Sequence, residues 1–377
     1  MVNQRIGEGV PPPRPILKYS ELIFIAFLSV IIVSALAGLR FGFMLTIGLG
    51  FGLVLEGLRF GFAGPWRAMI LRRDPSGLWA QLLSIGCVTL FALPLIAAYP
   101  DELFGASAPV GFAMVAGAFV FGAAMQVVLG CGSGTLVNAG SGNLVSLIAL
   151  PFLALGSFAG AYNLNWWTDL GTLPVVNVTG FKGVSITLFA LSVVAFITWV
   201  LASPENRKLP RRLVVAALLL SLLAILNLIL AGQPWGVVYG LGLWVAKTAL
   251  AIDLDPSVSI YWGAPANVER MQNSTLTDYT SLTNIGIIFG AFIVAHWRNS
   301  ELSKVLPKLS MRAWVATIIA GFLMGYSSRL AFGCNVGAFF SGISTGSLHG
   351  WVWFAAAFAG SVLGVRLRSI LGFEAKT

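Results

Sequence analysis

A series of apolar runs, each close to the length of a membrane-crossing helix, limits what this chain can fold into. Hydrophobic residues make up 57% of the chain and charged residues only 10%, which is too few to cover a water-soluble surface. A helix needs about 20 apolar residues to cross the hydrocarbon core, whereas strands of a membrane barrel alternate over about 10 residues. The sequence therefore predicts an all-α polytopic membrane protein. The candidate spans are residues 22–39, 41–58, 78–98, 110–129, 143–162, 184–202, 212–231, 235–251, 280–297, 311–330 and 348–367.

Two cysteine motifs indicate that much of the chain is duplicated. Gly130-Cys131-Gly132-Ser133-Gly134 recurs 203 positions later as Gly333-Cys334-Asn335-Val336-Gly337, so two of only three cysteines occupy equivalent places. The matches that support this spacing are Gly122 with Gly325, Ser141 with Ser344 and, after a shift of one residue, Leu144 with Leu348, Gly156 with Gly360 and Gly160 with Gly364. We predict a tail over 1–20, a first membrane repeat over 21–183, a linking span and basic loop over 184–211, and a second repeat over 212–377.

The distribution of charge predicts how the repeats are oriented. Basic loops stay in the cytoplasm, and this rule also accounts for most of the formal net charge of +9; attraction of an anionic substrate is the alternative explanation. The acidic loop 99–109 corresponds to the basic loop 298–310, so the repeats run in opposite directions through the membrane. Both termini are predicted to be cytoplasmic. Eleven spans conflict with inverted repeats that have both termini inside, so one of the weak candidates, for example 235–251, is expected not to cross fully; the sequence leaves open which one it is and whether ten or eleven segments cross.

Each cysteine motif interrupts an apolar stretch and is followed by a short segment, 135–142 in the first half and 338–346 in the second. Neither segment is long enough to span, so both are predicted to be re-entrant half-helices that line a central pore. Segments 60–65 and 261–267 share aromatic, glycine and proline residues and form a weaker second pair.

The residues of the cysteine motifs suit an anion that contains sulfur. Glycines let the backbone approach a ligand, and a helix start carries about +0.5 elementary charge. Ser133 and Thr135 add hydroxyl donors, and a thiol adds a weak donor and a polarizable atom. Close helix packing by small residues is the alternative explanation. Arg329 precedes Cys334 by five residues and either adds positive potential at the mouth or extends its side chain to the membrane interface.

Other polar residues receive structural interpretations. Cys87 lies inside an apolar span without a counterpart and is expected to pack in the core. Glu56 and Arg59 are three residues apart and are expected to pair near an interface. His296 and His349 lie at span ends and are expected to be interfacial. Nothing in the sequence suggests a metal site, another cofactor or a nucleic-acid surface.

At these motifs the chain resembles the YeeE/YedE family of sulfur-transport membrane proteins, which includes bacterial thiosulfate importers. The most specific stretch is residues 329–351, supported by 130–136, by Arg59-Phe60-Gly61-Phe62 and by Arg67, and the likeness covers about residues 41–370. It implies short re-entrant segments from both faces and a narrow centre lined by cysteines. The family's first-half motif usually reads Arg-Phe-Cys-Phe, whereas Gly61 stands at the cysteine position here.

Together these observations predict a permease of the bacterial inner membrane, which lies in the lipid bilayer and is not an enzyme. Its predicted substrate is a small sulfur-containing anion, and thiosulfate is the first candidate. An intramembrane thiol enzyme and a scaffold that docks a soluble cytoplasmic sulfur-carrier protein are the alternatives, and such a carrier is also a candidate partner of the permease. The predicted path residues are Gly61, Gly130, Cys131, Gly132, Ser133, Gly134, Thr135, Arg329, Gly333, Cys334, Asn335 and Gly337.

Overall fold

The computed structural model describes residues 19–298 and 309–373, and these residues form helices with two isolated β-bridges between loops. Most of the predicted tail 1–20 therefore lies outside the described residues. The long helices are α1 (Tyr19–Ala37), α2 (Leu39–Gly57), α4 (Ser76–Ala98), α5 (Phe112–Val128), α7 (Leu144–Tyr162), α9 (Gly180–Leu201), α10 (Arg211–Ala231), α13 (Tyr279–Arg298), α14 (Met311–Leu330) and α16 (Leu348–Ile370). The short ones are α3 (Ala63–Arg72), α6 (Gly132–Gly140), α8 (Leu164–Thr168), α11 (Val238–Ala251), α12 (Pro265–Gln272), α15 (Ser341–Ser344) and the π-helical η4 (Asn335–Phe340).

Ten segments of the described chain are long and apolar enough to cross a membrane. Each corresponds to a predicted span, and the all-helical fold class is confirmed. The segment that falls short is α11, with 14 residues; it corresponds to candidate span 235–251, one of the candidates that the sequence left open. A 14-residue helix is about 21 Å long, less than the hydrocarbon thickness of about 30 Å.

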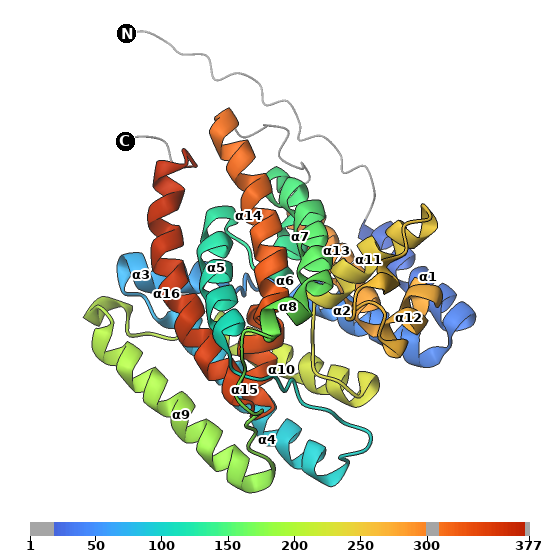
Figure 1. Cartoon of the computed structure of the whole chain (residues 1–377). Coiled ribbons are helices and arrows are strands. Elements are labelled where there is room, and N and C mark those ends of the chain that lie inside the picture. The colour runs from blue at the N-terminus through green and yellow to red at the C-terminus, as the bar shows by residue number, and fades with distance from the viewer. Residues whose placement is uncertain (1–18, 299–308, 374–377) are drawn as a thin grey trace.

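Helices from the two predicted halves pack closely against one another through glycines. A side chain at Gly122 of α5 would begin 1.9 Å from the Ala357 carbonyl oxygen of α16, and one at Gly325 of α14 would begin 2.0 Å from the Leu153 carbonyl oxygen of α7. Only a residue without Cβ allows backbones this close, a pattern common between membrane helices. The packing interlocks the halves, with α5 beside α16 and α14 beside α7 (Figure 1).

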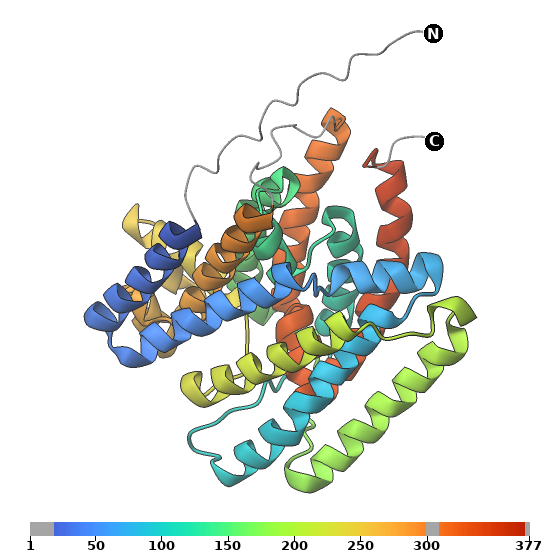
Figure 2. The same cartoon turned by 180° about the vertical axis from the view of Figure 1, so that it is seen from behind.

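Two helices lie at the edge of the bundle. In both views α9 runs along the outside of α4, and α1 lies at the periphery beside α2 (Figure 2). Their outward side chains are apolar and exposed, as with Phe181 at 80%, Phe189 at 73% and Leu36 at 72%. A belt of this kind is suited to lipid, because contact with lipid tails satisfies apolar side chains without burial in protein.

The two cysteine motifs break their helices in the same way. After α5, Leu129 adopts φ 55°, and after α14, Phe332 adopts φ 56°; each lies two positions before its cysteine. Non-glycine residues rarely adopt positive φ, so the shared outlier is a specific feature of the break. Cys131 is the N-cap residue directly before α6, and Cys334 is the N-cap residue directly before η4. With nine residues, α6 is only about 14 Å long, too short to cross alone.

Candidate functional site

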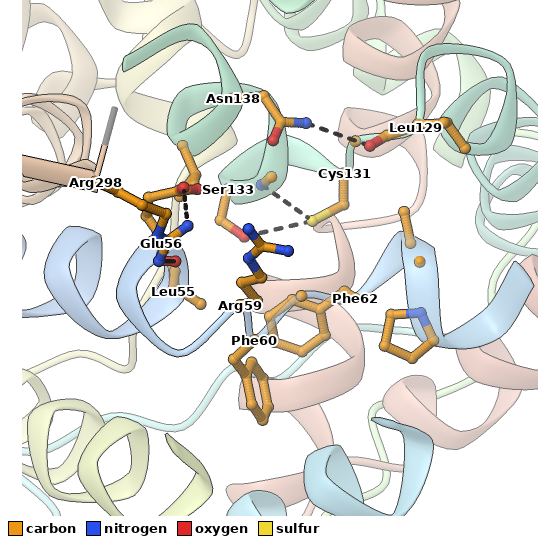
Figure 3. A pocket seen from close by; sticks show the side chains of 17 residues that line it. Leu55, Glu56, Arg59, Phe60, Phe62, Leu129, Cys131, Ser133, Asn138 and Arg298 are labelled. Atoms are coloured by element: carbon orange, nitrogen blue, oxygen red, sulfur yellow. Dashed lines mark hydrogen bonds and ion pairs between the residues drawn. The ribbon is translucent and has the colours of Figure 1, made fainter. Parts of the chain in front are cut away.

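A pocket of about 370 Å³ opens between the end of α2, the start of α3 and the first cysteine motif (Figure 3). Five of the predicted path residues line it, namely Gly61, Gly130, Cys131, Ser133 and Gly134. The remaining lining residues are Leu55, Glu56, Arg59, Phe60, Phe62, Ala63, Gly64, Pro65, Leu129, Val137, Asn138 and Arg298. Residues 60 and 131 are far apart in sequence, so the fold itself creates this site.

Cys131 is fully buried at the N-terminus of α6. The backbone N–H of Gly134 donates to its sulfur at 3.4 Å, and the Ser133 hydroxyl lies 3.4 Å from the same sulfur (Figure 3). The thiol therefore caps the helix, and the positive end of the helix is directed toward the cysteine. An anion near this thiol would be stabilised by the helix dipole and by the hydroxyl.

Cys334 lies beside the first motif. It is 1% exposed, and a Cβ placed on Gly132 would lie 3.0 Å from its sulfur. The neighbouring Asn335 is fully buried, and neither its amide nitrogen nor its amide oxygen has a hydrogen-bond partner among the described residues. The Thr135 hydroxyl is buried and unpartnered in the same way. Unpaired buried polar groups cost several kcal/mol in an apolar setting, about 1–3 kcal/mol in proteins, unless a ligand satisfies them.

Arginine side chains give the pocket positive charge. Arg59 points into the pocket from a backbone with φ 49° (Figure 3). The predicted pairing of Glu56 with Arg59 is wrong: Glu56 pairs with Arg298 instead, at 3.0 Å. Arg298 also donates to the carbonyl oxygens of Glu56 and Gly57 at the end of α2, because those last carbonyls have no partner within the helix. Arg298 is thereby held by α2, whereas Arg59 extends into the cavity.

The glycines around the cysteines differ in what surrounds them. A Cβ at Gly61 or at Gly337 would meet no heavy atom within 4 Å, and neither residue has the positive φ that favours glycine. Gly61 therefore does not serve a left-handed turn, and its missing side chain leaves open space. Gly333 is different, with φ 155° and a backbone nitrogen 2.6 Å from its would-be Cβ. Gly130 is also crowded, since a Cβ there would lie 2.9 Å from the Thr135 hydroxyl oxygen.

Arg329 is not among the residues that line the pocket. Its guanidinium donates to the Tyr261 hydroxyl and lies 4.9 Å from the Tyr261 ring centroid and 5.7 Å from that of Tyr239. The Tyr239 ring also contacts a second cation, because the Arg270 guanidinium lies 5.2 Å from its centroid. These contacts between cation and ring place Arg329 in a separate aromatic cluster.

The other polar residues take positions that only partly match expectation. Cys87 faces Ser221 across the α4–α10 contact and does not replace the missing cysteine at position 61. The two histidines lie near the ends of α13 and α16 and are buried in protein, His296 at 7% and His349 at 1% exposed. His349 lies 2.8 Å from the Ser347 hydroxyl through Nδ1.

Sequence reasoning missed a segment beside the cysteines. Residues 235–237 precede the short helix α11, and Cγ2 of Val238, the first residue of α11, lies 3.2 Å from a Cβ placed on Gly132. Segment 261–267, which the sequence suggested instead, contributes Trp262 to a separate buried cluster with Leu243 and Met271. The available signal was the Pro234-Trp235-Gly236 run, an aromatic–glycine–proline combination like that at 60–65.

Comparison with known proteins places this site in a family. The chain is 36% identical to the probable transporter YedE of Escherichia coli K12 over 28% of this chain and 25% of the relative, and 34% identical to YedE of Salmonella typhimurium LT2 over 26% and 24%. The matched part thus spans about a quarter of each YedE protein. This chain is also 27% identical to the thiosulfate transporter TsuA of Spirochaeta thermophila, over 82% of this chain and 93% of the relative. A family model described as sulphur transport matches residues 58–363, and the chain therefore belongs to the sulphur transport family.

Proposed function

We propose that this protein imports a small sulfur-containing anion, thiosulfate first, across a bacterial inner membrane through a constriction between Cys131 and Cys334. The chain is a multi-pass bacterial membrane protein of a transporter family, and its relatives are named as transporters rather than enzymes. The similarity to TsuA, at 27% identity over most of both chains, supports thiosulfate as the substrate.

One observation carries the proposal: the fold brings the second cysteine motif against the first. Gly132 has no side chain, and this absence is what leaves room for the Cys334 sulfur next to Cys131. The two thiols are both buried, and the residue after Cys334, Asn335, has a buried amide without a partner among the described residues. An anion passing there exchanges its hydration shell for thiol, hydroxyl and amide donors, and no bond to the anion is made or broken.

The two halves are proposed to be inverted repeats. In Figure 1, α14 begins and α16 ends at the same side of the bundle, so these helices run in opposite directions. Helix α5 runs parallel to α16, because Phe119 lies against Gly360 and Ala123 against Gly364. The equivalent helices α5 and α14 therefore run in opposite directions, which is the arrangement of inverted-repeat transporters.

The same geometry supports an orientation. Arg298 at the pocket, Arg312 at the start of α14 and Arg368 at the end of α16 are basic ends of helices, whereas Asp101 and Glu102 follow α4. By the positive-inside rule we assign the basic side to the cytoplasm. The pocket with Arg59 is then the inner mouth, and an even number of crossings places both ends of the chain on that side.

The short segments after the cysteines are proposed to be re-entrant half-helices. Cys131 caps the N-terminus of α6 through its sulfur, and Cys334 occupies the N-cap position of η4, so we propose that the positive ends of both segments are directed toward the centre. Half-helix N-termini of this kind hold anionic substrate groups in transporters. Backbone that is not helical at this depth is tolerated because it lines a polar path.

Uptake by the purified protein tests the proposal. Proteoliposomes that contain only this protein should accumulate radiolabelled thiosulfate, and liposomes without protein should not. Uptake that appears only after addition of a soluble sulfur carrier would favour the docking scaffold, and chemical conversion of the anion would favour the thiol enzyme. Absence of uptake of thiosulfate and of other small sulfur anions would refute the permease.

A further inference from the structure

We infer that residues 235–238 are the second-half equivalent of segment 60–63, and that Gly236 lines the path on the opposite side of the cysteine pair from Gly61. The inference rests on the proposed path between the halves, but it does not depend on which anion is carried. It assigns lining and positioning roles to residues outside the two cysteine motifs.

In each segment, a backbone carbonyl oxygen accepts a hydrogen bond from a buried side-chain amide. The Gln81 amide on α4 donates to the Gly61 carbonyl oxygen at 2.8 Å, and the Asn284 amide on α13 donates to the Val237 carbonyl oxygen at 2.9 Å. Both amide residues are fully buried. They are 203 positions apart, the same spacing that separates the two cysteines. A chance contact would not reproduce that spacing, so the segments occupy equivalent places.

The two segments also share a pattern of burial. In each, buried apolar residues flank one partly exposed glycine, and a short helix follows at once, α3 in the first half and α11 in the second. A Cβ at either glycine would meet no heavy atom within 4 Å, and neither glycine has a positive φ. The segments are Phe60-Gly61-Phe62-Ala63 and Trp235-Gly236-Val237-Val238.

An aromatic ring from each segment contacts the same residue of η4. Phe62 and Trp235 both approach Phe340 edge-on, with ring centroids 6.2 Å and 5.9 Å away. Segment 60–63 lines the pocket with Cys131, whereas Val238 lies against Gly132 on the side of Cys334. The two segments thus flank the constriction together.

The arrangement defines what each group does. The glycines leave width for a small anion because no side chain occupies the space next to their backbones. Gln81 and Asn284 are positioning residues, since each holds a carbonyl oxygen that would otherwise be unpaired at membrane depth. Loss of either amide frees one segment only, because each amide contacts its own segment.

Cysteine accessibility tests the lining role. In a Cys87→Ala background, Gly61→Cys and Gly236→Cys should each react with a charged, membrane-impermeant thiol reagent, the first from the cytoplasmic face in inside-out vesicles and the second from the outer face in spheroplasts. Added thiosulfate should slow both reactions at least threefold. The control is Leu254→Cys on an exposed loop, which should react without protection. Unreactive Gly236→Cys, or reaction of both variants from one face, would overturn the inference.

A second measurement tests the positioning role. Asn284→Ala should change the labelling rate of Gly236→Cys at least threefold and leave that of Gly61→Cys unchanged, and Gln81→Ala should do the reverse. Asn284→Asp keeps the size but removes the donor, so it should behave like Asn284→Ala. If Asn284→Ala changed the labelling rates of Gly61→Cys and Gly236→Cys equally, the two segments would not be held by separate amides, and the positioning role would be refuted. Folded yield of Gly236→Ala should match that of Gly61→Ala, and a collapse of Gly236→Ala alone would contradict the open space at Gly236.

Discussion

Cys334→Ala should reduce uptake far more than it reduces stability. Cys334 is 1% exposed, and its sulfur would lie 3.0 Å from a Cβ on Gly132, at the constriction proposed above. Water cannot easily replace the thiol there, so an anion at this point would lose one donor. The substitution removes one buried sulfur. Loss of a buried group about the size of a methylene lowers the free energy of unfolding by only about 1 kcal/mol.

The expected size of the effect follows from the lost hydrogen bond. A hydrogen bond to a charged group contributes about 1.5–3 kcal/mol, and each 1.36 kcal/mol corresponds to a tenfold change in rate. If the bond is made at the barrier to passage, Cys334→Ala should lower the kcat/KM of thiosulfate uptake by about 10- to 150-fold. Cys334→Ser keeps a donor in place of the soft sulfur and should fall between Cys334→Ala and the wild type.

The assay is initial uptake of labelled thiosulfate in proteoliposomes, divided by the amount of folded protein from size-exclusion chromatography. Cys87→Ala is the matched control, because Cys87 is a partly exposed cysteine on α4 away from the pocket. Cys334→Ala with wild-type uptake per folded protein would refute the reasoning. So would an equal loss in Cys87→Ala, since the effect could then not be assigned to the constriction.

Further substitutions separate the path from packing. Cys131→Ala should lower uptake at least tenfold, and an active Cys131→Ala alongside an inactive Cys87→Ala would show that the path was misassigned. Gly61→Cys should preserve or raise uptake per folded protein, whereas Gly61→Leu should block it by filling the pocket, and full transport by Gly61→Leu would remove this position from the path. Asn335→Ala should raise the KM for thiosulfate about tenfold in the same assay because it deletes an unpaired donor. Gly122→Ala should lower folded yield in detergent, since its Cβ would lie 1.9 Å from a backbone oxygen, and a normal yield would contradict the close contact of α5 with α16.

The membrane class, the spans and the helix breaks could be predicted from sequence because each is a local property. Length and apolarity set a span, and a run such as Gly130-Cys131-Gly132 interrupts it wherever it occurs. The positive φ of Leu129 and Phe332 could not be predicted, since neither residue type favours that conformation. The pairing of Glu56 with Arg298 could not be predicted either. Arg298 lies on α13, far from Glu56 in sequence, and helical periodicity predicts only pairs that are three or four residues apart.

The sequence pairs segment 60–65 with 261–267, whereas we infer 235–238, and this difference has a physical cause. A fixed spacing of 203 residues holds for the cysteines and for Gln81 with Asn284, but Gly61 and Gly236 are only 175 positions apart. Extra chain that includes α12 lies between α11 and α13 in the second half, without a counterpart between α3 and α4. A repeat extended at constant spacing therefore passes over segment 235–238 and selects segment 261–267, whose Trp262 packs in another cluster.

Glycine shows most clearly where sequence reasoning ends. Gly325 and Gly337 are 12 positions apart, and both match glycines of the first half at the same spacing. A side chain at Gly325 would collide with the Leu153 carbonyl oxygen at 2.0 Å, whereas one at Gly337 would enter open space. The first glycine allows close contact between helices, whereas the second would leave room beside Cys334 on the proposed path. Both positions require a residue without a side chain, so the sequence shows glycine at each. Only the surrounding backbone distinguishes a packing contact from open space.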